Sequence, residues 1–321
     1  MQILTQIDES VLKNHRSRQE FFWLDLIGPS DHDVKRLGRV LGLHPLAVED
    51  TIAFGQRPKL DVYDDQALLV LQGGTEADLE EDNPHPLEEI HCYISGDFVV
   101  TVRRNEFEDL SRLRTQLKSS SAARSEQYYV YRIIDTVVDT FFPVLAGLDD
   151  EINDLEDSIV DRPSKEELVK IFGLKRLLLQ MRKAVTPMRD LFAREIETIA
   201  DLAGLDRDSH DYFRDVYDHL IRISDLLDTY HDLVSGCTDL YLSNVANRQG
   251  EVGKQLTVVA SIFLPLSFLT GFFGMNFEWL TSHDTNETTF LIWGVGTLIV
   301  SLVALAIFFK HRGWFGSEDA G

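Results

Sequence analysis

Cysteine is scarce in this sequence, and its few copies are not paired. The 321 residues include two cysteines, Cys92 and Cys237, which lie far apart and outside any C-x-x-C pair. This spacing argues against a disulfide framework or a zinc site made of thiolates, and it fits a reducing compartment. The first eleven residues include Asp8 and Glu9 and have no long apolar run, so we expect no secretory signal there.

Basic residues are also few compared with acidic ones. Lys and Arg total 31 and Asp and Glu total 53, which gives a formal net charge of −22. Such a polyanion does not bind nucleic acid through a general electrostatic field, so no nucleic-acid partner is expected. Excess acid attracts cations, or simply keeps a cytosolic domain soluble. The sequence lacks a P-loop, G-x-G-x-x-G, H-E-x-x-H and G-x-S-x-G, so we predict that the protein is not an enzyme.

Charged residues are absent from two long stretches near the C-terminus. Leu256–Met275 and Phe290–Phe309 each contain twenty residues and no charge. About twenty apolar residues in a helix span a hydrocarbon core of ~30 Å. We therefore predict transmembrane helices over residues 256–276 and 290–310. The alternative, two core helices of a soluble protein, is less consistent with two adjacent charge-free runs.

The basic residues near these runs lie before the first run and after the second, and none lies between them. Arg248 and Lys254 precede the first run, and Lys310 and Arg312 follow the second, whereas residues 276–289 contain no Lys or Arg. The positive-inside rule then places both termini in the cytoplasm of a multi-pass inner-membrane protein. The predicted outer loop is 277–289, and 311–321 is a cytosolic tail. Lys254, Lys310 and Arg312 are expected to form a basic belt at the inner surface, or merely to snorkel.

The first part of the chain mixes strand and helix patterns, so we predict a cytosolic α/β domain over residues 1–125 with a small mixed sheet. The expected helix is Asp31–Leu41, with Ser30 as N-cap and Gly42 at its end. The expected strands are Phe21–Leu26, Ala67–Leu71, Ile90–Ile94 and Phe98–Val102, the last two joined by a hairpin turn at residues 95–97.

Two acidic groups occur in the predicted cytosolic part. Seven acids and no base lie between Glu76 and Glu89; a solvated loop is the plainer interpretation, and a weak Mg²⁺ site is the alternative. The second group has helical spacing, so one helix face bears four carboxylates: Asp150, Asp154, Asp157 and Asp161. Like charges at i, i+4 cost roughly 0.2–0.5 kcal/mol per pair. Either the protein tolerates this repulsion between the four carboxylates, or cations or a basic partner lie close to them and offset it.

Helical patterns fill residues 126–208, which we predict to form a helical pair, and continue through a stalk over residues 209–255. No proline occurs between Ser209 and Pro265, so the stalk helix should be continuous with the first transmembrane helix. From Asp211 to Met275 such a helix would be on the order of 100 Å long. Because that length cannot fold inside one globule, we expect an oligomer in which several stalks pack together.

The segment Gly271–Phe277 resembles the signature of the CorA family of magnesium/cobalt transporters, in which an aromatic residue precedes Gly-Met-Asn. Here the tripeptide closes the first transmembrane helix and a short loop follows. Other stretches also resemble the family, and together they extend from about Phe21 to Phe315: Leu43–Asp50, Gln56–Lys59, Phe213–His219 and Leu256–Leu266.

This resemblance implies an α+β fold assembled as a homopentameric funnel in a lipid bilayer, with a pore lined by the first transmembrane helix of each subunit. It implies influx of Mg²⁺, with Co²⁺ and Ni²⁺ as further ions, and closure by cytosolic Mg²⁺ bound between subunits. Mg²⁺ would be both the transported and the regulatory ion. The selectivity filter would be Gly274, Met275 and Asn276, whose neutral oxygens could hydrogen-bond the water shell that Mg²⁺ releases reluctantly. A simple helix cap is the other interpretation of Asn276.

Further site residues follow from the resemblance and from spacing. The expected pore-lining positions are Gly271, Thr270, Ser267, Leu264, Leu256, Gly253 and Gly250. Leu264 and Leu256 would form hydrophobic constrictions or face lipid. Gly250 and Gly253 stand where the family often has Asn and Met, so the inner gate is in question.

The regulatory site would include Asp215, with Glu76 or Asp78 as its partner, and the Asp150–Asp161 face would oppose the basic belt in the closed state. Two alternatives remain open: a Zn²⁺ transporter of the related branch, and a non-conducting membrane-anchored cation sensor. Zinc prefers nitrogen and sulfur ligands, and the two charge-free runs contain neither His nor Cys.

Overall fold

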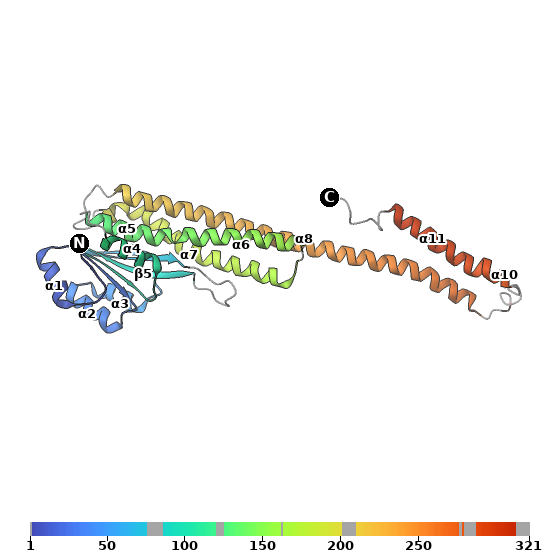
Figure 1. Cartoon of the computed structure of the whole chain (residues 1–321), viewed down its shortest axis with the longest axis horizontal. Helices are drawn as coiled ribbons and strands as arrows, with labels where there is room; N and C mark the ends of the chain where they lie inside the picture. Colours follow the sequence, from blue (N-terminus) through green and yellow to red (C-terminus); the bar gives the residue numbers. More distant parts are fainter. Residues whose placement is uncertain are drawn as a thin grey trace. The chain divides into compact units, whose positions relative to one another are not determined.

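The computed structural model describes residues 2–75, 86–119, 125–161, 163–200, 210–275, 278 and 287–312. The chain divides into two compact units, Met1–Leu240 and Tyr241–Gly321. Helices of both units are labelled in Figure 1.

The first unit contains a mixed six-stranded sheet with the strand order β1-β2-β6-β5-β4-β3. Its first three strands in this order are parallel, and the remaining pairs are antiparallel. The strands are β1 (Gln2–Leu4), β2 (Phe22–Ile27), β3 (Lys59–Tyr63), β4 (Gln66–Gly74), β5 (Leu87–Ile94) and β6 (Phe98–Arg103). The predicted strands and the predicted β5–β6 hairpin are all present.

Three short helices pack on one face of this sheet: α1 (Glu9–Arg18), α2 (Asp31–Leu41) and α3 (Pro45–Ala53). Their apolar side chains are buried in one cluster with alternate residues of β2, β4 and β6, as expected for a period of two along each strand. A capping box between Ser30 and Asp33 begins α2, and Gly42 ends it in the left-handed region at φ +70°. Both predicted ends of this helix are confirmed.

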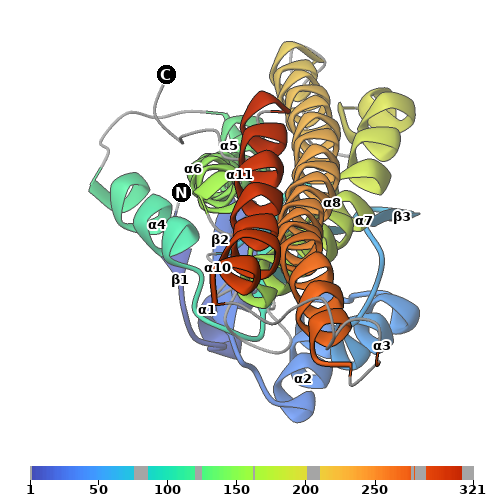
Figure 2. The same ribbon diagram turned by 90° about the vertical axis from the view of Figure 1, so that its right-hand side faces the viewer.

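Longer helices lie on the other side of the sheet, as Figures 1 and 2 show. They are α4 (Glu108–Ser119), α5 (Glu126–Asp139), α6 (Phe141–Asp161) and α7 (Lys165–Ala200). The junction of α5 and α6 approaches β4 closely, because Thr140 Oγ1 accepts a 2.8 Å hydrogen bond from the backbone N–H of Gly74. A Cβ atom on Gly74 would lie 3.1 Å from the Thr140 carbonyl oxygen, so a side chain there would disturb the contact.

Helix α8 (His210–Phe273) is 64 residues long and belongs to both units. Its first part is buried in the first unit through apolar residues at three- and four-residue steps: Phe213, Val216, Leu220, Ile223, Leu227, Tyr230 and Val234. The second unit contains the remainder of α8, α10 (Glu287–Thr289), the π-helical segment η2 (Phe290–Val295) and α11 (Gly296–His311). The predicted α+β fold, with a mixed-sheet domain, a long helix and two apolar C-terminal helices, is confirmed.

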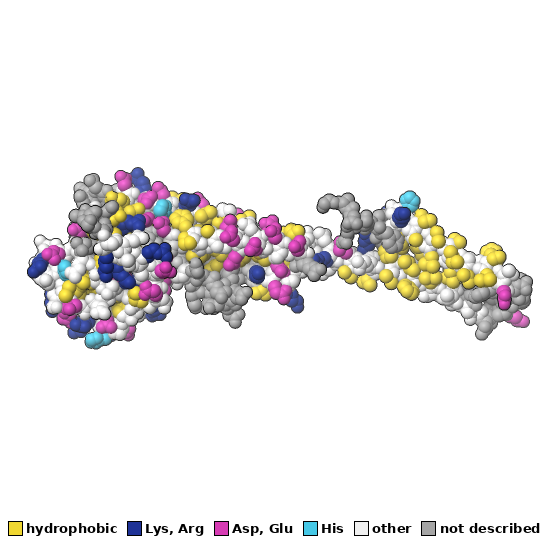
Figure 3. Space-filling view, viewed as in Figure 1, with side chains coloured by type: hydrophobic (Ala, Val, Ile, Leu, Met, Phe, Trp, Pro, Cys, Tyr) yellow, Lys and Arg dark blue, Asp and Glu magenta, His cyan; other side chains and the backbone are white. Residues whose placement is uncertain are grey.

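Two helices are long and apolar enough to cross a membrane: Asp211–Phe272, through its C-terminal part, and Leu291–His311. Large apolar side chains on both are exposed, among them Leu264 at 70 % and Trp293 at 64 %. Figure 3 shows the resulting hydrophobic surface over these helices. Apolar patches of this extent are rare on soluble monomers and mark surfaces that lipid or protein covers.

Candidate functional site

Helices α5 and α8 bring together polar side chains that recur every four residues. Tyr131, Asp135 and Asp139 follow one another along α5, and Asp215 and His219 do so along α8, so each set lies on one helix face. The Tyr131 hydroxyl donates a 2.9 Å hydrogen bond to Asp215 Oδ2. His219 Nδ1 lies 2.8 Å from Asp139 Oδ1 and 3.7 Å from Asp135 Oδ1. We call these five residues the α5–α8 cluster.

Three atoms of this cluster converge without hydrogen bonds. Potential ligand atoms of Asp135, Asp139 and His219 all lie within 4.8 Å of one another. Asp135 Oδ1, Asp139 Oδ1 and His219 Nδ1 are shielded from solvent, and none has a hydrogen bond of acceptable geometry. Buried polar atoms without partners are uncommon in folded proteins. His219 Nδ1 and Asp139 Oδ1 form an ion pair only when the imidazole is protonated, and with a neutral imidazole a divalent cation could bind all three atoms, so these residues fit a metal centre.

The electrostatics of the cluster also favour a cation. Asp135 is buried at 3 % exposure. That burial, together with the neighbouring Asp139 carboxylate, raises the pKa of Asp135 to about 6, although Arg132 and His219 oppose the shift. Burial and the hydrogen bond to Asp215 raise the pKa of Tyr131, which keeps its hydroxyl protonated as a donor. A bound cation would relieve the repulsion between the two carboxylates.

The donor set is mixed. Carboxylate oxygen is the ligand that Mg²⁺ and Ca²⁺ prefer, whereas imidazole nitrogen suits Co²⁺, Ni²⁺ and Zn²⁺. The imidazole ring of His219 is held in place by the edge-on ring of Phe142, with 5.6 Å between the ring centroids. The cluster can therefore accept a hard cation through its carboxylates and a transition metal with the added help of His219.

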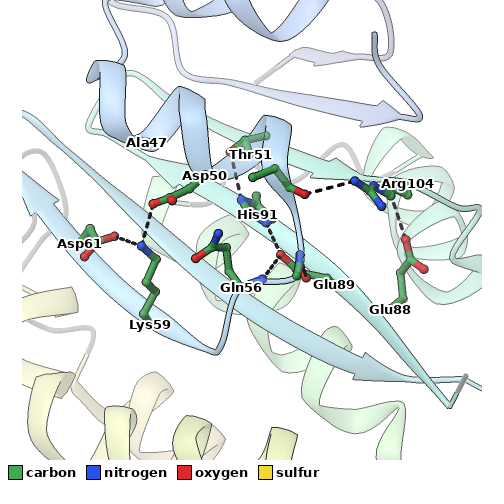
Figure 4. A network of polar contacts seen from close by, with 12 residues as sticks. Ala47, Asp50, Thr51, Gln56, Lys59, Asp61, Glu88, Glu89, His91 and Arg104 are labelled. Carbon is green, nitrogen blue, oxygen red and sulfur yellow. Dashed lines mark hydrogen bonds and ion pairs between the residues drawn. The ribbon is translucent and has the colours of Figure 1, made fainter. Parts of the chain in front are cut away.

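A second polar network in the same unit surrounds His91, and both ring nitrogens of this histidine have hydrogen-bond partners. His91 on β5 contacts Thr51 Oγ1 at 3.0 Å through Nδ1 and Glu89 Oε1 at 2.6 Å through Nε2 (Figure 4). Glu89 also accepts hydrogen bonds from the backbone N–H groups of Gly55 and Gln56. Because both ring nitrogens of His91 have partners with hydrogen-bond geometry, this residue acts as a structural tie between α3 and β5.

The predicted regulatory residue Asp215 lies in the α5–α8 cluster, whereas Glu76 and Asp78 lie outside the described residues. Asp135, Asp139 and His219 were not among the residues predicted from the sequence. Two signals were available: an Asp pair at i, i+4 among the apolar residues at the end of α5, and a histidine four residues after Asp215. The predicted acidic face of α6 is exposed at all four positions: Asp150, Asp154, Asp157 and Asp161.

The predicted selectivity filter begins where α8 ends. The Gly274 N–H donates a 3.0 Å hydrogen bond to the Thr270 carbonyl, and the Met275 N–H donates a 3.3 Å bond to that of Phe272. A Cβ atom on Gly274 would lie 3.1 Å from the Thr270 carbonyl oxygen, so this turn favours a residue without a side chain. Met275 is 50 % exposed, and Asn276 lies outside the described residues.

The other predicted pore positions are all exposed in the second unit: Gly250, Gly253, Leu256, Leu264, Ser267, Thr270 and Gly271. Leu256 is 65 % exposed. The Thr270 hydroxyl donates to the Leu266 carbonyl at 2.8 Å, which leaves its oxygen lone pairs free to accept. The residues of the predicted basic belt, Lys254, Lys310 and Arg312, are exposed as well.

Known proteins with similar sequences are described as metal-ion transporters. A sequence model of the family described as CorA-like Mg²⁺ transporter protein matches residues 18–311. The chain is 32 % identical over 302 residues to the cobalt/magnesium transport protein CorA of Thermotoga maritima, with 91 % of this chain and 83 % of that protein covered. It is 24 % identical to the zinc transport protein ZntB of Yersinia enterocolitica, over 85 % of this chain and 81 % of the relative.

Among solved structures, the CorA magnesium transporter of Methanocaldococcus jannaschii has a similar fold. The TM-score is 0.78 at 21 % sequence identity, and 91 % of each chain is covered. At this level of identity the likeness concerns the fold.

Proposed function

The chain belongs to the CorA-like Mg²⁺ transporter protein family, and from this premise we propose that it is a channel for Mg²⁺ influx that cytosolic Mg²⁺ closes. Co²⁺ and Ni²⁺ are proposed as further permeant ions. A divalent cation gains about 4.6 kcal/mol per 100 mV of membrane potential, twice the value for one charge. A gain of this size could drive passive uptake.

One observation supports the proposal above the others. The same helix, α8, supplies Asp215 and His219 to the α5–α8 cluster and ends at Gly274, where a Cβ atom would meet the Thr270 carbonyl oxygen at 3.1 Å. One continuous element thus connects a candidate cation sensor with the candidate filter. Rings of Gly274 carbonyls and Asn276 amides would offer neutral oxygens to a hydrated ion, which binds them weakly enough to leave.

We assign the parts of the chain accordingly. Residues 1–125, 126–208 and 209–255 would be the cytosolic α/β domain, the helical pair and the stalk, with 311–321 also in the cytoplasm of an inner-membrane protein. Residues 256–276 would line the pore of a homopentamer, 277–289 would lie outside, and 290–310 would pack against lipid. Supporting this, the predicted pore positions Leu256 and Leu264 are exposed in a single copy.

For regulation, we propose that Asp135, Asp139 and His219 hold the cytosolic cation, with Asp215 beside them. A bound Mg²⁺ would offset the repulsion between Asp135 and Asp139 and hold α8 against α5. Its loss would leave the buried Asp135 carboxylate within 4.8 Å of the partly exposed Asp139 carboxylate, and their repulsion favours separation of the helices. Glu76 or Asp78 of a neighbouring copy is the proposed further ligand.

Flux into liposomes at controlled internal Mg²⁺ tests the proposal. Wild type should take up Mg²⁺ when internal Mg²⁺ is low and stop when it is high, and Asn276→Ala should lose most uptake or its preference for Mg²⁺. Equal uptake by both proteins would refute the role of the filter. No uptake by wild type, with a cation-dependent conformational change intact, would identify a sensor instead.

The same liposomes distinguish a zinc transporter. The zinc-transporting relative and the imidazole of His219 favour this second candidate, while the charge-free runs Leu256–Met275 and Phe290–Phe309 contain no His or Cys. Faster Zn²⁺ than Mg²⁺ uptake at equal gradients would establish it.

A further inference from the structure

Helices α1, α2 and α3 lie together in the first unit (Figures 1 and 2), and two surface hollows are lined by residues of α2 and its neighbours. The first hollow has a volume of about 350 Å³ and is lined by Glu9, Lys13, His32, Arg36, Arg39 and Val40. The second has a volume of about 460 Å³, and Gly38, Leu43, Pro45 and Val48 line it beside His32 and Arg39. Because His32 and Arg39 border both, the hollows are adjacent.

The first hollow is positively charged in a chain whose net charge is −22. Its single carboxylate, Glu9, is shared: Arg36 Nε lies 2.6 Å from Glu9 Oε1, and Lys13 Nζ lies 3.6 Å from Glu9 Oε2. Arg39 has no ion-pair partner within 4.0 Å among the described residues, and it is exposed. Cations therefore exceed acids at this point of the surface.

Two further acids, Asp8 and Asp33, act electrostatically on Arg36, and both also accept hydrogen bonds at helix N-termini. Asp33 accepts hydrogen bonds from the Ser30 hydroxyl at 2.6 Å and the Ser30 N–H at 3.3 Å, because it closes the capping box of α2. Lys35, which also lines the second hollow, has no ion-pair partner in the part of the chain that the structure describes. Arg39 follows Arg36 by three residues and Lys35 by four, so it is a neighbour of each on the surface of α2, and an anion could contact Arg39 together with either one.

The second hollow is mostly apolar. It exists because α3 approaches α2 at Gly38, where a Cβ atom would lie 2.7 Å from Val48 Cγ2. Leu43, Pro45 and Val48 supply apolar surface to it. An apolar hollow next to a cationic one matches the usual composition of small-molecule sites, which combine apolar walls with a few charged groups.

We propose that this surface binds a nucleoside di- or triphosphate. Its phosphates would lie against Lys13, Arg36 and Arg39, since guanidinium groups bind phosphate oxygens in pairs. Its base would lie in the apolar hollow between α2 and α3. The site is separate from the α5–α8 cluster and from the pore segment, and it does not depend on the proposed transport function.

Equilibrium binding of labelled ATP to the full-length protein in detergent, at constant free Mg²⁺, tests this proposal. Wild type should bind ATP saturably and more weakly as salt rises. Arg39→Gln should bind about tenfold more weakly, because a hydrogen-bonded charged contact is lost, and Arg39→Lys should recover part of the affinity. Lys118→Gln removes an exposed cation from α4 and should leave binding unchanged.

Competition experiments distinguish the contribution of the phosphates to binding from that of the base. Tripolyphosphate should displace ATP, but less effectively than unlabelled ATP, and adenosine should not displace it at the same concentration. Tripolyphosphate that competes as well as ATP would overturn the assignment of the base to the apolar hollow. Absence of saturable ATP binding, or equal binding by wild type and an Arg39→Gln protein with unchanged circular dichroism, would overturn the site.

Discussion

At the scale of single residues, Gly274 has a steric reason to be glycine. A Cβ atom there would lie 3.1 Å from the Thr270 carbonyl oxygen, closer than backbone oxygen comfortably permits, and the Thr270 carbonyl already accepts the Gly274 N–H. We predict that Gly274→Ala shifts the last turn of α8 and lowers Mg²⁺ flux by tenfold or more, on the order of 1.4 kcal/mol in the barrier. Flux into liposomes measures this.

The matched control for this prediction is Gly236→Ala on the same helix. A Cβ atom at Gly236 meets nothing within 4 Å, and alanine stabilises a helix relative to glycine by roughly 1 kcal/mol. Gly236→Ala should therefore retain flux. If Gly274→Ala conducts as well as Gly236→Ala, the tight turn at Gly274 has no part in ion passage.

The raised pKa of Asp135 predicts a particular dependence of stability on pH. The pKa of this carboxyl is raised from 3.8 to about 6 by burial and by Asp139, so the folded protein holds the proton more tightly than the unfolded chain. Stability therefore falls as pH rises between these two values, and the penalty is complete above about pH 6. Without divalent cations, Asp135→Asn should raise the free energy of unfolding at neutral pH by on the order of 1–3 kcal/mol.

Thermal unfolding in a chelator at about pH 5 and pH 7.5 checks this sign. The gain in Asp135→Asn should be larger at the higher pH, since asparagine keeps an acceptor for Arg132 and has no charge to desolvate. Asp154→Asn, on the exposed face of α6, should change little at either pH. If Asp135→Asn melts at a lower temperature than wild type at about pH 7.5, burial of the charged carboxylate is not the cause of the raised pKa of Asp135.

At the scale of secondary-structure elements, the α5–α8 cluster links two helices that are separated in sequence by α6 and α7. A cation that binds only the folded protein at 100 times its dissociation constant would stabilise this link by about 2.7 kcal/mol. We predict that Mg²⁺, Co²⁺ and Ni²⁺ each raise the melting temperature of wild type. His219→Asn should weaken the effect of Co²⁺ and Ni²⁺ more than that of Mg²⁺, because it removes the nitrogen ligand and leaves the carboxylates.

Titration of melting temperature against each cation tests the prediction. Asp139→Asn should weaken all three responses, and Asp232→Asn, whose side chain is 88 % exposed on α8, should weaken none. Unchanged Co²⁺ and Mg²⁺ titrations in His219→Asn would exclude the imidazole as a ligand.

The ends of a helix and the turn of a hairpin were predictable from the sequence, because neighbouring residues determine them. Ser30 and Gly42 mark the ends of α2, and Ser95-Gly96-Asp97 turns the chain between β5 and β6, because caps and turns depend on adjacent residues. Helix α3 was not predicted; its N-cap is His44, which accepts from the Leu46 N–H in place of the usual Ser, Thr, Asp or Asn.

The candidate cation site was predictable only in part, because its residues come from two helices that are distant in sequence. Asp215 was expected from a resemblance, but its neighbours come from another helix and meet it only through tertiary packing. The i, i+4 spacing of Asp135 and Asp139 is visible in the sequence, but Asp150 and Asp154 have the same spacing, and the first pair became distinct only when His219 was found 2.8 Å from Asp139. Local patterns predict elements; contacts between distant elements require the fold.

At the scale of the whole molecule, charge and apolar surface are separated along the chain. Acidic side chains are frequent on the first unit, and hydrophobic side chains cover the helices of the second (Figure 3). Among the basic residues near the apolar runs, Lys254 precedes the first run, Lys310 and Arg312 follow the second, and the segment between the runs contains no Lys or Arg. This distribution is the one that directs a helical hairpin to insert with both ends in the cytoplasm.

Cysteine labelling tests this orientation without removal of the native thiols. Cys92 and Cys237 are buried at 1 % and 3 % exposure, so a membrane-impermeant maleimide should not label the wild-type protein in intact cells. Ser282→Cys, in the predicted outer loop, should react in intact cells. Thr115→Cys, on the exposed surface of α4, and Ser317→Cys, in the predicted tail, should react only after permeabilisation. The reverse pattern would place Gly274 and Asn276 at the inner surface and would exclude them as the outer filter.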